Sequence, residues 1–169
     1  MCIRDRHYTR VKGEVAEKNP INLENMQQPL VVLPIARWDR MTEKAVRFAL
    51  MLSQEIKVVN VDCDDGEESL CNVWDRNVLD PIRAKGMHEP ELITLHSTFR
   101  LVVMPLMEYI MELEHQNPGR KITVLLPELV VRHWWENALH NQRVQLLKVL
   151  LLLKGNEHIV VVNLSLIHI

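Results

Sequence analysis

The stretch KITVLLPELVVRHWWENALHNQRVQLLKVLLLLK, residues Lys121–Lys154, decides the fold. Residues 122–126 form a β-branched and leucine run that predicts a buried strand closed by Pro127. Beyond the proline, large apolar residues recur at near-helical spacing and predict a long helix: Trp135, Leu139, Leu146, Leu150 and Leu153. A strand, a proline corner and a helix form one βα unit of an α/β domain.

The same alternation extends outward from this unit. Further apolar runs of strand length predict strands at 30–36, 56–61, 92–95 and 159–162. Helices are expected from a cap at Asp39 to Leu52, over 70–84, and from a Ser97 or Thr98 cap to about residue 116. The order βαβαβαβαβ predicts one open five-stranded parallel sheet with helices on both faces.

Prolines and glycines refine these boundaries. Pro81 is expected to weaken the 70–84 helix, which Gly86 then ends. Pro105 predicts a kink or a late start in the following helix. The sequence Asn-Pro-Gly at 117–119 predicts a turn.

Length and composition indicate a single globular domain. The chain has 169 residues, of which 47% are hydrophobic and 25% are charged. The 20 basic and 22 acidic side chains nearly balance, which argues against a nucleic-acid partner. The apolar run at 149–153 lies between two lysines and is too short to cross a bilayer.

The three cysteines, at positions 2, 63 and 71, form no CxxC pair and fit a reducing, cytoplasmic setting. A Cys63–Cys71 disulfide is the competing hypothesis.

The two ends differ in character from the rest of the chain. MCIRDR (residues 1–6) and LSLIHI (residues 164–169) are what ATG TGT ATA AGA GAC AGx and CTG TCT CTT ATA CAC ATC encode. These strings resemble the transposon end used in sequencing-library adapters, read on opposite strands. We therefore expect adapter translation at both ends, a juxtamembrane stub and linker at 7–28, and the domain at 29–163. The alternative is that LSLIHI extends the last strand.

The strongest acidic cluster lies after the second predicted strand. Carboxylates at 62, 64, 65, 67 and 68 could hold calcium or magnesium, but their spacing does not match an EF-hand loop. A solvated acidic turn is the preferred interpretation, and no metal site is predicted.

The candidate catalytic residues do not form a complete site. His133 and His140 share a helical face but lack the further ligands that zinc needs. No Ser, Thr or Cys has a recognisable base or elbow context. Glycines, which let backbone N–H groups approach phosphates, are absent from 127–141. We therefore expect neither an enzyme nor a cofactor.

Four stretches together carry a family resemblance: LVVLPIARWDRMTEKAVRFALMLS, IKVVNVD, STFRLVVMPLMEYI and ITVLLPELVVRHWWENALHNQR. The most specific part is P-E-L-V-x-R-H-W-W with L-H-N-Q, at 127–135 and 139–142. Over residues 7–163 the chain resembles the soluble C-terminal domain of bacterial amino acid permeases of the amino acid, polyamine and organocation superfamily. That domain is similar to universal stress proteins.

The resemblance implies a strand order of 3-2-1-4-5. ATP-binding stress proteins use an Asp at the end of the first strand and a G-x2-G-x9-G-[ST] loop after the fourth. This chain has Ile35 and Ala36 at the first place and no such glycine loop. The resemblance therefore implies the fold without ATP binding.

The predicted function is a regulatory or interaction domain on the cytoplasmic face of the bacterial inner membrane, without a reaction of its own. Its expected partner is the transmembrane core of the same permease, preceding residue 7. A homodimer through the sheet edge or the long helix, and a small-molecule regulator, are further expectations. The expected ligand or interface contacts lie at the carboxyl ends of strands: Arg37, Trp38, Asp39, Arg132, His133, Trp134 and Asn141. The alternative is a free-standing nucleotide-binding stress protein.

Overall fold

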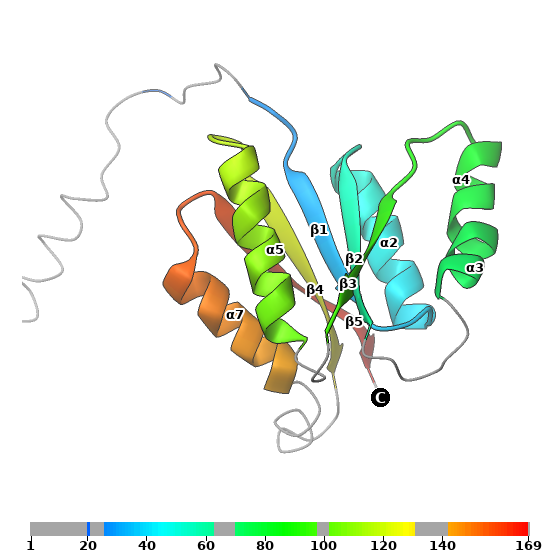
Figure 1. Ribbon diagram of the computed structural model, residues 1–169. Helices are drawn as coiled ribbons and strands as arrows, with labels where there is room; N and C mark the ends of the chain where they lie inside the picture. Colours follow the sequence, from blue (N-terminus) through cyan, green and yellow to red (C-terminus); the bar gives the residue numbers. More distant parts are fainter. Residues whose placement is uncertain (1–19, 21–25, 63–69, 98–101, 131–141, 169) are drawn as a thin grey trace, which may run out of the picture.

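Five parallel strands form one sheet in the computed structural model, which describes residues 20, 26–62, 70–97, 102–130 and 142–168 (Figure 1). Their order is β3-β2-β1-β4-β5, as predicted. The strands are β1 (Leu30–Ile35), β2 (Ile56–Asp62), β3 (Glu91–His96), β4 (Ile122–Val130) and β5 (Ile159–His168).

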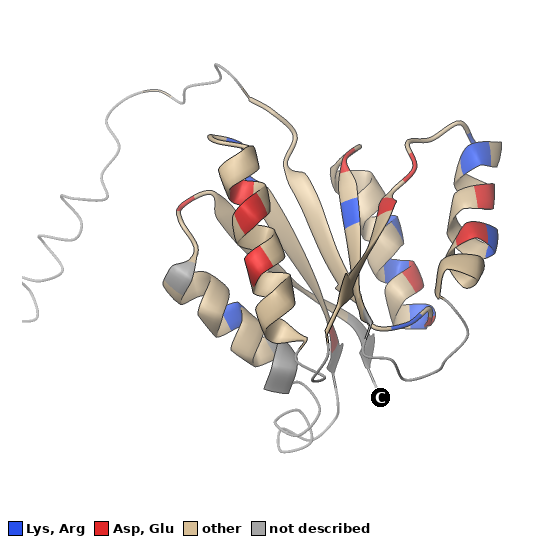
Figure 2. Ribbon diagram, viewed as in Figure 1, with Lys and Arg blue, Asp and Glu red and all other residues tan. Residues whose placement is uncertain are grey.

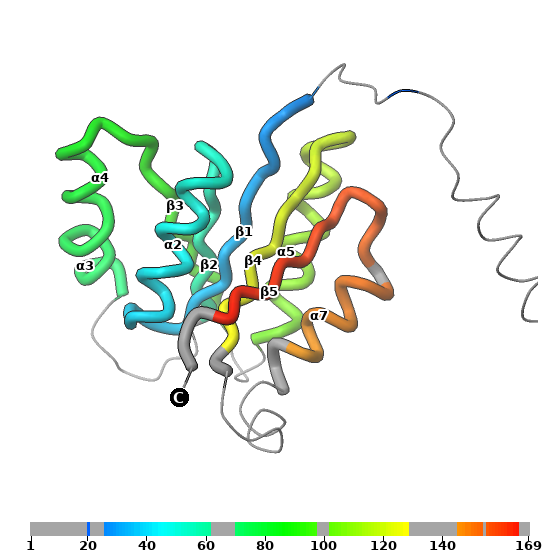
Figure 3. Tube along the Cα trace, turned by 180° about the vertical axis from the view of Figure 1, so that it is seen from behind, coloured from blue at the N-terminus to red at the C-terminus, as the bar shows by residue number. Residues whose placement is uncertain are grey.

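Helices cover both faces of this sheet. The helical elements are α2 (Arg40–Leu52), α3 (Leu70–Trp74), the π-helical turn η1 (Asp75–Leu79), α4 (Asp80–Ala84), α5 (Val103–Gln116) and α7 (Gln142–Lys154). One face carries α2 together with the α3–η1–α4 segment, and the other carries α5 and α7 (Figures 1 and 3). The alternation of strands and helices in the sequence therefore predicted the layer architecture correctly.

The central strand β1 supplies both hydrophobic cores. Val31, Leu33 and Ile35 pack toward α2, whereas Leu30 and Val32 pack toward α5 and α7. Successive side chains of a strand point to opposite faces, so a strand buried on both faces is apolar throughout. This explains why LVVLPI lacks the polar alternation of a half-exposed strand.

Strand β4 corrects the prediction that Pro127 closes it. The strand runs to Val130 and stays paired with β5, whereas its pairing with β1 ends at Val32 and Val124. Proline lacks an N–H donor and is tolerated where one side of a strand has no neighbour to bond. Both strands carry a proline just past this point, Pro34 in β1 and Pro127 in β4, where their ladder ends.

Strand β5 is longer than predicted. It extends from Ile159 to His168 rather than ending at Val162, and Leu164 is buried in the core on the α2 side. Residues 164–168 therefore extend the last strand, which is the alternative that the sequence offered for LSLIHI. Their adapter origin stays a prediction.

The starts of two helices, α2 and α5, test the predicted start signals. The Oδ1 atom of Asp39 accepts the Thr42 N–H at 2.8 Å, which confirms the predicted cap of α2. Helix α5 begins at Val103, so Pro105 lies in its first turn and the late start is confirmed. Val102 occupies the cap position without a side-chain hydrogen bond, so the predicted Ser97 cap is wrong; Thr98 lies outside the described residues.

The segment before Pro81 is wound as a π-helix. Proline cannot donate to the preceding turn, and the Asp80 N–H bonds the Asp75 carbonyl five residues earlier. The predicted weakness of the 70–84 helix is therefore a change of helical type rather than a break. Gly86, at φ 63°, follows it in the left-handed conformation expected of a helix end.

Helix α7 corrects the expected leucine stripe. Leu147 and Leu151 are buried, whereas Leu146 and Leu153 of the predicted stripe are 52% and 77% exposed. The part of the predicted helix that would carry residues 131–141 lies outside the described residues. Apolar side chains surround this helix, so periodicity alone could not indicate which leucines face the core.

In the part of the chain that the structure describes, no helix is both long enough and apolar enough to cross a membrane.

Candidate functional site

The loop Arg37–Asp39 follows β1 at the point where β1 and β4 are no longer paired. It is fixed by Thr42, which is buried in the first turn of α2. The Thr42 hydroxyl donates to the Arg37 carbonyl at 2.7 Å, while its backbone N–H donates to the Asp39 carboxylate. Two hydrogen bonds to one buried residue hold this loop in a single shape.

The N-terminus of α2 already has a negatively charged partner. Asp39 caps it with one carboxylate oxygen, and its other oxygen lies 3.7 Å from Nε of Arg37. The Arg37 side chain is 72% exposed, so it can turn toward another anion. A phosphate at this helix end would meet the Asp39 charge, which makes the site unsuited to a nucleotide.

Trp38 packs against a second tryptophan, Trp74, from α3. The ring centroids lie 6.1 Å apart and the ring planes are nearly perpendicular, at 87°. Trp74 is only 1% exposed, and its indole Nε1 has no hydrogen-bond partner among the described residues. Trp38 is therefore partly a core residue, held by an edge-to-face contact of the kind that aromatic pairs prefer.

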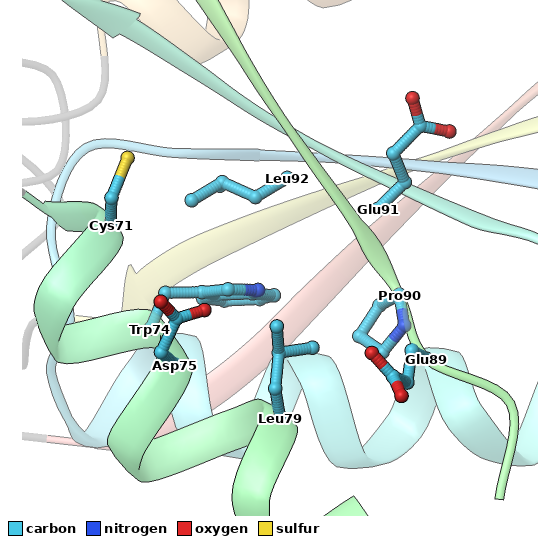
Figure 4. A pocket seen from close by; sticks show the side chains of 8 residues that line it. All are labelled: Cys71, Trp74, Asp75, Leu79, Glu89, Pro90, Glu91 and Leu92. Carbon is cyan, nitrogen blue, oxygen red and sulfur yellow. The ribbon is translucent and has the colours of Figure 1, made fainter. Parts of the chain in front are cut away.

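Two shallow hollows flank this tryptophan pair. One, of about 380 Å³, is lined by Trp38, Asp39, Arg40, Glu43 and Asn77. The other, of about 420 Å³, lies between the α3–η1 segment and the start of β3. Figure 4 shows its lining, with the Trp74 ring between Leu79 and Leu92, and with Glu89 and Glu91 on the β3 side: Cys71, Trp74, Asp75, Leu79, Glu89, Pro90, Glu91 and Leu92.

The carboxylates of the larger hollow are mostly neutralised by neighbouring cations. Arg83 donates two hydrogen bonds of 2.9 Å to Glu89, which lowers the pKa of that carboxyl. Glu91 is paired with Lys57 across β2 and β3. These ion pairs brace the edge of the sheet, and the hollow offers a polar rim around an apolar floor rather than an acid–base pair.

The predicted contact residues divide into two groups. Arg37, Trp38 and Asp39 lie together in one loop at the carboxyl end of β1, as expected. Arg132, His133, Trp134 and Asn141 lie outside the described residues. Sequence reasoning missed Thr42 and Trp74; the single large aromatic residue of the 70–84 helix was the signal for Trp74.

The described residues also bear on the predictions for a metal site and for a disulfide. There, no three His, Cys, Asp or Glu side chains lie close enough to hold a metal ion. The acidic turn beyond Asp62 lies outside those ranges. Cys71 is an exposed free thiol, which argues against the competing Cys63–Cys71 disulfide; Cys63 itself lies outside the described residues.

A family model described as the KimA potassium transporter C-terminal domain matches residues 26–165, which include the whole sheet up to the middle of β5. The chain belongs to this family. The KimA C-terminal domain family is thus represented here by a five-stranded parallel sheet of order 3-2-1-4-5.

One relative is a much longer protein. The chain is 27% identical over 152 residues to the potassium transporter KimA of Bacillus subtilis (strain 168). The match covers 88% of this chain but only 23% of that protein, so most of the relative has no counterpart here. The expectation that the chain is a transporter's C-terminal domain is confirmed. The family shown is that of the KimA C-terminal domain, rather than the amino acid permeases of the sequence resemblance.

Proposed function

We propose that the chain is the regulatory C-terminal domain of a potassium transporter and acts on the membrane-embedded transport core of the same polypeptide. The observation that carries this proposal is the family match over residues 26–165. The relative with that name is more than four times as long as the matched part, which leaves room for a transport core.

Potassium is the proposed cargo. The family description and the name of the Bacillus subtilis relative both specify it. The sequence resemblance instead indicated an amino acid cargo within the amino acid, polyamine and organocation superfamily. The superfamily remains part of the proposal for the transport core, and an amino acid cargo is the alternative.

The cytoplasmic side of the membrane is the proposed location of the domain. The free, exposed Cys71 fits a reducing compartment. The near balance of 20 basic and 22 acidic side chains favours a protein partner over nucleic acid.

A non-catalytic role is part of the same proposal. The Arg37–Asp39 loop presents an arginine and an indole, and its carboxylate, Asp39, is engaged in capping α2. We infer a universal-stress-protein-like domain from the 3-2-1-4-5 sheet, but one in which Asp39 fills the helix terminus that phosphates would use.

Calorimetric titration of the purified chain with ATP tests the second candidate function, a free-standing nucleotide binder. Its strand order is the feature that favours it. We expect no heat of binding at micromolar ATP, and saturable binding that Asp39→Asn strengthens would replace the regulatory proposal.

A domain transplant tests the regulatory function. Residues 26–165 of this chain replace the matched C-terminal region of the Bacillus subtilis transporter, and potassium uptake is compared with that of the transporter truncated before that region. We expect truncation to change uptake and the transplant to restore it. A transplant that behaves like the truncated protein would refute the proposal.

A further inference from the structure

Arg120 joins three segments of the chain at the amino ends of the strands. Because all five strands are parallel, the segment that leads into β1 and the α2–β2 and α5–β4 connections lie at this same edge of the sheet (Figure 1). The Arg120 Nε–H donates to the backbone carbonyl of Gln28 at 3.0 Å, and its Nη1 donates to the Glu55 carboxylate. The Arg120 side chain is only 19% exposed, so it is embedded between the segments that it joins.

Gln28 is held by its side chain as well as by its backbone. Its Oε1 accepts the Gln54 N–H at 3.4 Å, at the connection between α2 and β2. Pro29 follows, and its ring restricts the backbone between Gln28 and β1. Hydrogen bonding to the neighbouring strands starts only at Leu30, whose N–H donates to the Lys121 carbonyl. Contacts outside the sheet ladder therefore fix the chain two residues before the sheet begins.

We propose that Arg120, together with Gln28 and Glu55, forms a clamp that fixes the direction in which the preceding polypeptide enters the domain. The proposal rests on the function proposed above, in which the transport core belongs to the same polypeptide. If the chain pivoted freely at Gln28, movement of the transport core would not turn the domain. The clamp couples the two parts, and Arg120 and Glu55 are its positioning residues.

The clamp depends on the shape of the arginine side chain. A guanidinium is planar and carries its N–H donors in a fixed fork, so one side chain holds two acceptors at once. A lysine has the same charge but offers it at the end of a flexible stem. The turn that carries Arg120 is itself fixed, because its N–H donates to the Asn117 carbonyl and the Asn117 side chain donates to the Leu113 carbonyl of α5.

Arg83 provides a matched control at the same edge of the sheet. Basic and acidic residues lie along this edge (Figure 2) and form three ion pairs: Lys57–Glu91, Arg83–Glu89 and Arg120–Glu55. Arg83 also uses its fork, with two hydrogen bonds of 2.9 Å to Glu89. Its acidic partners, Asp80 and Glu89, belong to α4 and to the segment before β3. Arg120 differs because its fork also reaches the chain that leads into β1.

Amide hydrogen exchange in the purified chain tests whether the clamp holds the start of β1. Arg120→Lys should speed exchange at Leu30 and Val31 about tenfold, as expected for the loss of one hydrogen bond to a charged group. Glu55→Ala should act in the same way, because it releases the guanidinium from its carboxylate. Arg83→Lys should leave both amides unchanged. Unchanged exchange in the two clamp variants, or equal acceleration in all five strands, would overturn the clamp.

Potassium uptake by the transplanted transporter tests whether the clamp couples the two parts. Arg120→Lys should shift uptake from the rate of the transplant toward that of the truncated transporter, whereas Arg83→Lys should not shift it. Uptake that Arg120→Lys leaves unchanged, or that Arg83→Lys shifts equally, refutes the coupling role of the clamp alone. A parent transplant with uptake like that of the truncated transporter refutes the regulatory function itself.

Discussion

Replacing Trp74 with alanine should remove a large part of the stability of the domain. The side chain is 1% exposed and belongs to the core between α2 and the sheet. Truncation of a buried aromatic residue costs about 3–5 kcal/mol. With a urea dependence of about 2 kcal/mol per molar, the unfolding midpoint should fall by roughly 2 M.

The contact with Trp38 makes this prediction sharper. Edge-to-face pairs contribute about 0.5–1.5 kcal/mol beyond their burial, so Trp38→Ala and Trp74→Ala should be non-additive by about that amount. Trp74→Phe should cost less than the alanine variant, because it keeps an aromatic ring in the core while removing the unpaired indole N–H. Met51→Ala, at an exposed position, is the control and should lie within about 0.5 kcal/mol of the parent.

Urea unfolding followed by far-ultraviolet circular dichroism measures these four variants and the double variant Trp38→Ala/Trp74→Ala. A loss below about 1 kcal/mol for Trp74→Ala would show that the ring is not part of the core. If the losses in unfolding free energy of the two tryptophan variants add fully in the double variant, the T-shaped contact contributes nothing to stability. Trp38 would then be available as a ligand contact instead of a core residue.

Three further predictions concern the helices. Asp39→Ala should cost about 1 kcal/mol in unfolding free energy, with Asp39→Asn nearly neutral, because the cap to Thr42 needs only an acceptor oxygen; equal losses in both variants would contradict this. Gly155→Ala should lower the melting temperature, since its Cβ would overlap the backbone carbonyl of Leu151, and an unchanged melting temperature would show that the end of α7 can yield. Burial, reinforced by two nearby carboxylates, raises the pKa of Tyr109 from 10.0 to about 12. The free energy of unfolding should therefore be unaffected by this tyrosine below about pH 10 and should fall between about pH 10 and 12, where only the unfolded chain is ionised. Tyr109→Phe should flatten that fall, and identical pH profiles would contradict the assignment.

The sheet was predictable because its strands are apolar on both faces. Runs such as LVVLPI and IKVVNV are short, β-branched and bounded by polar residues, which favours parallel strands over helices. Asp39 also predicted the start of α2, because a carboxylate at that position can accept a hydrogen bond from the first turn of a helix. These signals are local, so no knowledge of tertiary contacts was needed to read them.

The errors arose where tertiary contacts decide the outcome. Pro127 ends a strand by local rules, but β4 continues because only β5 needs its hydrogen bonds beyond Val124. The leucines of α7 surround the helix, so the buried pair Leu147 and Leu151 could not be separated from the exposed ones by spacing. The position of the Arg37–Asp39 loop after β1 followed from the sequence, and its role as a contact site stays a prediction. The Trp38–Trp74 contact joins residues far apart in sequence, so no local pattern predicts it.

Potassium flux through the full-length protein that carries this domain tests the central claim most directly. The protein, with and without residues 26–165, is reconstituted in liposomes, and uptake of potassium and of labelled amino acids is recorded in parallel. Our account predicts potassium uptake whose rate changes when the domain is removed. Amino acid uptake in place of potassium uptake, or potassium uptake that is the same without the domain, would contradict it.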